Sequence, residues 1–144
     1  MADRSPEASV TGSPEGLSSG EATRRRILGD AHVDRAKAAT TGFDAPFQDL
    51  ITASAWERVW SRPAWTTRER SIVTIALLAA LGHEEELAMH VRATRNTGAS
   101  ADDICETLMH VAIYGGVPAA NTAFRVAKRT LAEMDAEGRE GRQP

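Results

Sequence analysis

Residues 71–81, SIVTIALLAAL, form the most apolar stretch of the chain and constrain its fold more than any other segment. Thr66 or Thr67 can cap a helix that leads into this stretch, with Glu69 in its first turn, and Gly82 ends or kinks it. The helix is apolar on nearly every side. We therefore expect it to be buried all round, within the domain or against another subunit.

Helical periodicity recurs along the rest of the chain. Helices are predicted from about residue 21, with an interruption at Gly29, over 43–60, over 84–96, from the Ser100 cap to the glycines at 115–116, and from Pro118 onward. No stretch shows the sustained alternation of a strand. The sequence therefore predicts an all-α, single-domain array of five to six helices, whose core an oligomer interface completes.

Three segments differ in composition. Residues 1–20 are rich in Ser, Gly and Pro and are predicted to be a disordered extension. Residues 21–136 carry the helical domain, and residues 137–144 form a polar tail.

Composition narrows the classes of function. The net charge of −3 argues against binding to a nucleic-acid backbone, which needs a basic surface. No apolar run reaches the roughly 20 residues that span a bilayer, and the N-terminus has no apolar leader, so we expect a cytoplasmic protein without a membrane partner. Cys105 is the single cysteine, which excludes an internal disulfide and dithiol chemistry within one chain.

The candidate site follows the apolar stretch directly, in residues 82–98, GHEEELAMHVRATRNTG. His83, Glu86 and His90 stand at positions i, i+3 and i+7 of a helix and so share one face. Partial burial there would shift their pKa values. A two-histidine, one-carboxylate metal site is an alternative, but i to i+7 spans about 10 Å of helical rise, too far for one ion to bridge easily.

The chain resembles the carboxymuconolactone decarboxylase family, within the wider alkylhydroperoxidase-D-like helical superfamily. The resemblance is carried by five segments in one order: RRRILGDAHVDRA, FQDLITASAWERVWSRP, RERSIVTIALLAALG, EELAMHVRATRNTG and HVAIYGGVPAANTAFRVA. Peroxidatic members of the superfamily have CxxC followed four residues later by His. Here His83 and Glu86 occupy the cysteine positions before His90, which disfavours the peroxidase branch. Glu57 and Trp65 depart from the decarboxylase pattern.

The resemblance implies a cofactor-free decarboxylation in protocatechuate catabolism. A butenolide lactone with two carboxylates, 4-carboxymuconolactone, loses CO2 and becomes the enol-lactone of 3-oxoadipate. The electrons delocalise through the ring alkene onto the lactone carbonyl, so no cofactor or metal is needed. The protein must hold a dianion, stabilise an oxyanion and deliver a proton.

Candidate residues for these tasks follow from the resemblance and from residue chemistry. His90 is the first candidate for the proton transfer, Glu86 one turn earlier can orient its ring by a hydrogen bond, and His83 is a further catalytic candidate. Guanidinium groups match carboxylates, and the candidates here are Arg62, Arg70 and, less favoured as an ordinary surface charge, Arg92.

The remaining substrate-binding candidates are Trp56, Tyr114 and Gly116. Trp56 can wall a pocket, Tyr114 can donate from its phenol, and Gly116 lets backbone approach a ligand before a helix N-terminus. The resemblance also implies a homo-oligomer, a trimer or hexamer. The alternatives are a related lactone- or carboxylate-processing homologue and a non-enzymatic oligomer that binds small anions.

Overall fold

The computed structural model describes residues 17–141, and within them it contains seven α-helices, one π-helical segment and no strand. The predicted all-α class is therefore confirmed. In chain order the elements are α1 (Ser19–Leu28), α2 (Asp30–Ala39), α3 (Ala45–Ile51), η1 (Thr52–Trp60), α4 (Thr67–Leu81), α5 (Glu84–Thr97), α6 (Ala101–Tyr114) and α7 (Val117–Glu140).

The predicted count of five to six helices is wrong for two physical reasons. Gly29 has a φ of 89°, which breaks the chain into α1 and α2 rather than only interrupting one helix. The helix predicted over residues 43–60 begins at Ala45 and changes from α to the wider π geometry at Thr52. The predicted disordered extension lies mostly outside the described residues, and α7 continues to Glu140, within the predicted polar tail.

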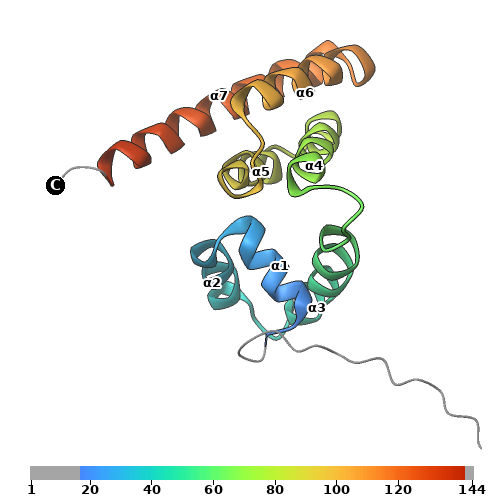
Figure 1. The fold of residues 1–144 in the computed structure, drawn as a ribbon, viewed down its shortest axis with the longest axis vertical. Helices are drawn as coiled ribbons and strands as arrows, with labels where there is room; N and C mark the ends of the chain where they lie inside the picture. Colours follow the sequence, from blue (N-terminus) through green and yellow to red (C-terminus); the bar gives the residue numbers. More distant parts are fainter. Residues whose placement is uncertain (1–16, 142–144) are drawn as a thin grey trace, which may run out of the picture.

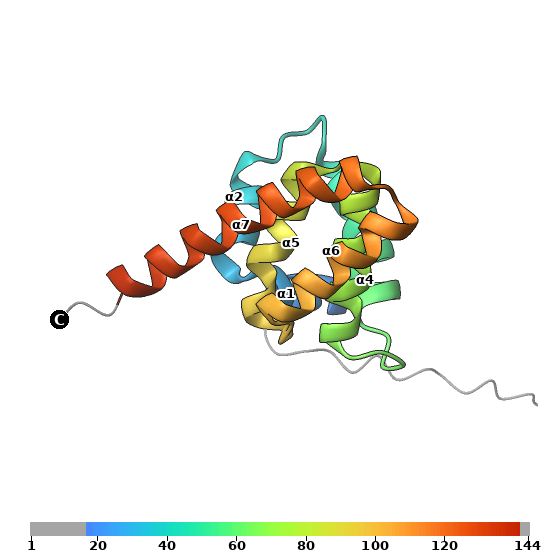
Figure 2. The ribbon, with the colours of Figure 1, turned by 90° about the horizontal axis from the view of Figure 1, so that it is seen from above.

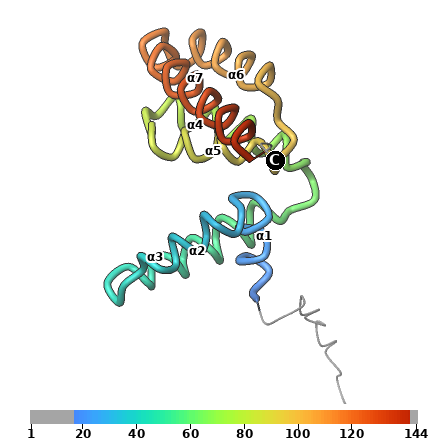
Figure 3. The backbone as a smooth tube through the Cα atoms, turned by 90° about the vertical axis from the view of Figure 1, so that its left-hand side faces the viewer, coloured from blue at the N-terminus to red at the C-terminus, as the bar shows by residue number. Residues whose placement is uncertain are grey.

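The helices form three layers (Figure 1). The segment from α1 to η1 makes one layer, α4 and α5 the middle layer, and α6 and α7 the third, as Figure 3 also shows from the side. In the middle layer, α5 packs against α1 on one side and α7 on the other, and α4 packs against α6. Helix α7 crosses α5, and its last turns extend beyond the other helices (Figure 2).

Local signals set the ends of the site-bearing helices. Thr66 and Glu69 make the predicted capping box at the start of α4, and Gly82 ends it with a φ of 77°. Gly98, also with positive φ, ends α5. Ser100 and Asp103 make a second capping box that starts α6.

Two hydrophobic clusters hold the layers together. The larger joins α4 to α7 and includes Ile75, Leu87, Val91 and Leu108. The smaller joins α1, η1 and α5 through four side chains: Ile27, Trp56, Trp60 and Ala93. Helix α5 contributes to both, so His90 lies in the helix that connects the two cores.

A broad apolar surface is left uncovered on α4 and α6. In this chain α4 is not buried all round: Ile75 and Ala79 are buried, whereas Leu77 is 57% exposed. On the neighbouring α6, Ile113 is 77% exposed and Tyr114 is 83% exposed. Isolated exposed apolar residues are ordinary, but a contiguous set marks an interaction surface. Among residues 17–141, no helix is long and apolar enough to cross a membrane.

Candidate active site

His90 is buried between helices, with 7% of its surface exposed, and packs against two tryptophans. The ring centroids of His90 and Trp60 lie 5.9 Å apart, and those of His90 and Trp56 lie 6.4 Å apart, with 16° between the ring planes in both pairs. The two indoles are 5.4 Å from each other. An imidazole enclosed in this way is shielded from bulk water on its aromatic sides.

Both tryptophans of η1 are buried. They stand four residues apart in this segment, in which the π-helix bonds residue i to i+5. The hydroxyls of Thr52 and Ser54 donate to the carbonyls of Gln48 and Leu50, four residues earlier. The Thr52 N–H also donates to the Gln48 carbonyl, so this carbonyl accepts from both the backbone and the side chain of Thr52 at the start of η1.

The electrostatic environment keeps the His90 ring neutral. Burial and, to a smaller extent, the positive charge of His32 lower its pKa to about 4, while the negative charge of Glu86 opposes the shift. The Nδ1 atom of His90 is buried and has no hydrogen-bond partner among the described residues. The ring can therefore accept a proton, but only a very small fraction of the rings is protonated at neutral pH unless an anion lies nearby.

The predicted row of titratable groups on α5 is only partly assembled. Glu86 is exposed, and within residues 17–141 no hydrogen bond joins it to His90, so the predicted orientation of the ring by Glu86 is not observed. His83 is exposed as the N-cap residue of α5. Across the described chain, no three His, Cys, Asp or Glu side chains come together as a metal site.

The predicted arginines have separate environments. Arg70 is partly buried, its Nη2 donates to the carbonyl of Arg62 at 2.8 Å, and its guanidinium lies 5.9 Å from the Trp65 ring centroid. The Arg70 Nε is buried and has no acceptor within the described residues. Arg92 is held by Glu133 and Glu137 on α7, so its charge is already paired.

Tyr114 and Gly116 lie away from His90 in this chain. Tyr114 ends α6, where its ring stacks on His110 at 5.3 Å, and Gly116 precedes α7 with a φ of 102°. Both belong to the layer of α6 and α7, whereas the tryptophans that pack on His90 belong to the layer of α1 and η1 (Figure 1). The single chain thus brings Trp56 to His90 but does not bring Tyr114 or Gly116 there.

Sequence reasoning missed His32. It is half-buried on α2, and it lines a cleft of about 760 Å³ together with Arg35, Arg95 and Asn96. Burial and the charges of Arg35 and Arg24 lower its pKa. The only signal in the sequence was its place just after the helix break, in the segment GDAHVDRA.

Comparisons with known proteins agree with this architecture. The model of the carboxymuconolactone decarboxylase family matches residues 45–129. The chain is 41% identical over 111 residues to 4-carboxymuconolactone decarboxylase from Acinetobacter baylyi, which covers 77% of this chain and 83% of that protein. It is 35% identical over 115 residues to nitrosuccinic acid decarboxylase npaB from Metarhizium robertsii, which covers 80% of each chain. This chain therefore belongs to the carboxymuconolactone decarboxylase family.

Proposed function

We propose that this protein is a carboxy-lyase that converts 4-carboxymuconolactone to the enol-lactone of 3-oxoadipate in protocatechuate catabolism. The observation that carries the proposal is the 41% identity to the Acinetobacter baylyi enzyme over most of both chains. The second relative is also named a decarboxylase, which supports the same reaction class. The buried, neutral imidazole beside two indoles is a site that suits proton transfer in a dry environment.

The reaction divides into two bond changes. The bond between the ring carbon and its carboxylate breaks, CO2 leaves, and the electron pair moves through the ring alkene to the lactone carbonyl oxygen. A proton then adds to a ring carbon and restores the lactone. The protein contributes charge complementarity, exclusion of water and a positioned proton donor.

His90 is assigned to the proton transfer. With a pKa of about 4, roughly one ring in a thousand is protonated at pH 7 in the free protein. A dianion bound beside the ring favours the imidazolium and raises this pKa. The bound substrate therefore favours protonation of His90, and His90 then transfers this proton to the substrate. Trp56 and Trp60 keep water away from the ring.

Arg70 and Arg62 are assigned to the carboxylates of the substrate. Arg62 lies in the turn between η1 and α4, and Arg70 lies near the start of α4, where it donates to the Arg62 carbonyl. The buried Nε of Arg70 is without an acceptor in the described chain. Glu86 and His83 are exposed on α5 and are assigned supporting roles without contact to His90; the negative charge of Glu86 favours the protonated His90 ring. Tyr114 and Gly116 can join such a site only from a second subunit.

A homo-oligomer, a trimer or hexamer, is part of the proposal. The apolar surface of Leu77, Leu81, Ile113 and Tyr114 supports it, since water contact with so many neighbouring apolar groups is unfavourable. Light scattering after size-exclusion chromatography tests it. Three or six times the chain mass of 15.5 kDa is expected, and a monomer at micromolar concentration would contradict it.

Decarboxylation of a related small dicarboxylate is the second candidate. The 35% identity to a nitrosuccinic acid decarboxylase favours it, because the same scaffold then acts on a different carboxylate. Glu57 and Trp65, which depart from the family pattern and are exposed near the tryptophans, are positions at which specificity can differ.

The decisive experiment measures CO2 release from 4-carboxymuconolactone and from nitrosuccinate under the same conditions. Preference for the lactone is expected, preference for nitrosuccinate supports the second candidate, and no release from either overturns both. His90→Gln is expected to lower kcat at least about 100-fold, as loss of a general acid–base group does. Cys105→Ser, which changes an exposed side chain on α6, is the control and keeps the wild-type kcat.

A further inference from the structure

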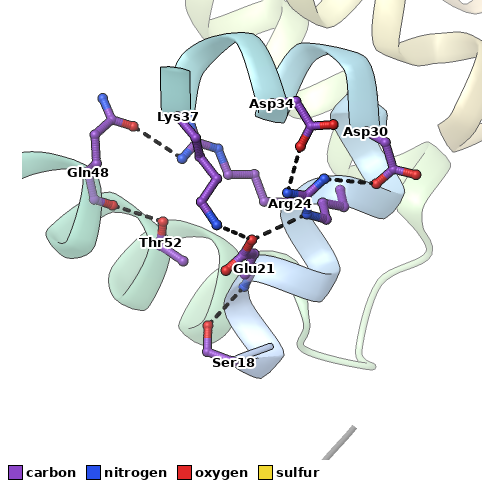
Figure 4. A network of polar contacts seen from close by, with 9 residues as sticks. Ser18, Glu21, Arg24, Asp30, Asp34, Lys37, Gln48 and Thr52 are labelled. Carbon is purple, nitrogen blue, oxygen red and sulfur yellow. Dashed lines mark hydrogen bonds and ion pairs between the residues drawn. The ribbon is translucent and has the colours of Figure 1, made fainter. Parts of the chain in front are cut away.

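Three consecutive arginines, residues 24–26, lie in the second half of α1, and the structure gives one of them an unusual environment. Arg25 is engaged by Glu21, Asp30 and Asp34 at 3.3, 3.1 and 2.8 Å. Arg24, in contrast, is only 8% exposed and forms no salt bridge within residues 17–141. Its Nη1 donates to the neutral amide oxygen of Gln48 at 3.1 Å, and its Nε is buried without an acceptor (Figure 4).

A buried guanidinium without a carboxylate is energetically costly. Buried charges in proteins are normally paired, because removing an ion from water costs several kcal/mol unless an opposite charge compensates. Burial lowers the pKa of Arg24 and the charge of Glu21 opposes that shift, which is the signature of a desolvated cation. The local acidic groups cannot supply the missing charge, since Glu21 is already bound by Lys37 at 2.6 Å and by Arg25.

Arg24 lines a cleft that can admit a small molecule. The cleft has a volume of about 410 Å³, within the range of ligand pockets, and lies between α1, α2, α3 and η1. Polar side chains face it from every element: Ser18, Lys37, Thr40, Gln48 and Thr52. Asp49 and Glu57 also line it, but both are exposed, so water and salt screen their charges.

We propose that this cleft binds a small-molecule carboxylate, whose oxygens are held by the guanidinium of Arg24 and the amide NH2 of Gln48. The Gln48 oxygen already accepts from Arg24, so its amide nitrogen is oriented as a donor beside the guanidinium. Together they present adjacent N–H groups of the kind that match the two oxygens of one carboxylate.

The experiment is a ¹H–¹⁵N NMR titration of the full-length protein with glutarate, at constant ionic strength maintained with chloride. The Arg24 Nε–H and Gln48 side-chain NH2 signals are expected to shift together with one dissociation constant. Arg24→Gln is expected to weaken that constant at least about tenfold, as loss of a charge-assisted contact does. Arg129→Gln, which changes an exposed arginine on α7, leaves it unchanged.

Arg24→Lys keeps the positive charge but loses the paired N–H donors of the guanidinium, so an intermediate weakening of glutarate binding is expected. This variant replaces Arg24→Gln in the experiment if Arg24→Gln does not fold. The absence of any shift with glutarate would overturn the proposal. Equal affinity in wild-type protein and in both Arg24 variants would overturn it as well, because the anion would then bind elsewhere.

A second arm, a steady-state assay of lactone turnover compared with the titration, identifies the source of the carboxylate. If Arg24→Gln raises the KM for the lactone by about the same factor as the dissociation constant for glutarate, the cleft binds one carboxylate of the substrate. If KM is unchanged while glutarate binding is lost, the cleft takes a different carboxylate, and the proposal still stands. A wild-type protein that does not turn over the lactone would refute the proposed function and leave the binding result intact.

Discussion

The titration of His90 provides a quantitative test of the candidate site. In the folded protein its pKa is lowered from 6.5 to about 4, with burial as the largest cause. In the unfolded chain the ring is solvated and has the ordinary value. Between these pH values the unfolded state therefore binds more protons than the folded state, and stability falls as the pH decreases.

The magnitude follows from this difference. Each pKa unit corresponds to about 1.4 kcal/mol, so His90 alone costs the folded state about 3 kcal/mol as the pH falls from 7 to 4. His90→Gln removes this contribution. The stability of the variant relative to wild type is therefore expected to improve by about 3 kcal/mol over the same pH range, because every other titrating group is common to both proteins.

Urea denaturation at pH 7 and pH 4 measures the effect, and the imidazole signals in an NMR titration report the pKa directly. Met109→Leu, which changes an exposed side chain that does not titrate, serves as the control and is expected to show the wild-type pH dependence. The reasoning is refuted if the His90 signal titrates near pH 6.5, or if His90→Gln and wild type lose stability in parallel.

Three further predictions concern packing, helix ends and assembly. Leu108→Ala removes a side chain with 0% exposure and is expected to cost about 2–5 kcal/mol in urea denaturation; a smaller loss would show that the core there can collapse. Gly82→Ala meets no atom within 4 Å, yet its φ of 77° disfavours a β-carbon, so a loss of about 1 kcal/mol is expected, and none would mean that the turn adjusts. Leu77→Asp and Ile113→Asp place charges on the uncovered apolar surface and are expected to reduce the mass measured by light scattering without changing helical circular dichroism; an unchanged mass would exclude this surface from the interface.

Helix ends were the part of the fold that the sequence predicted best. The Thr66–Glu69 pair and Gly82 mark α4 because a cap and a positive φ are local requirements that few residue types meet. The π segment was not predictable, because a short apolar stripe fits a repeat of 3.6 residues nearly as well as a wider one. That both tryptophans of this segment are buried follows from its packing against α1 and α5, which the local sequence does not contain.

The sequence predicts the site only to the extent that the spacing of residues along a helix determines which way their side chains face. Residues at i and i+4 differ by about 40° around a helix. That difference is enough for His90 to be buried while Glu86 stays in water. The sequence also does not tell which of the three adjacent arginines, residues 24–26, faces inward; in the fold it is Arg24 that is buried. Both distinctions depend on contacts between helices that are distant in sequence.

Helix α5 has a consequence for any attempt to divide this chain. Leu87 and Val91 belong to the larger hydrophobic cluster and Ala93 to the smaller, so the same fourteen-residue helix packs against both clusters. A fragment that starts after Trp60 would lack α1 and η1, and the face of α5 that carries His90 would then be exposed to water. The burial of the His90 imidazole thus depends on both halves at once, and neither half can be exchanged as an independent module.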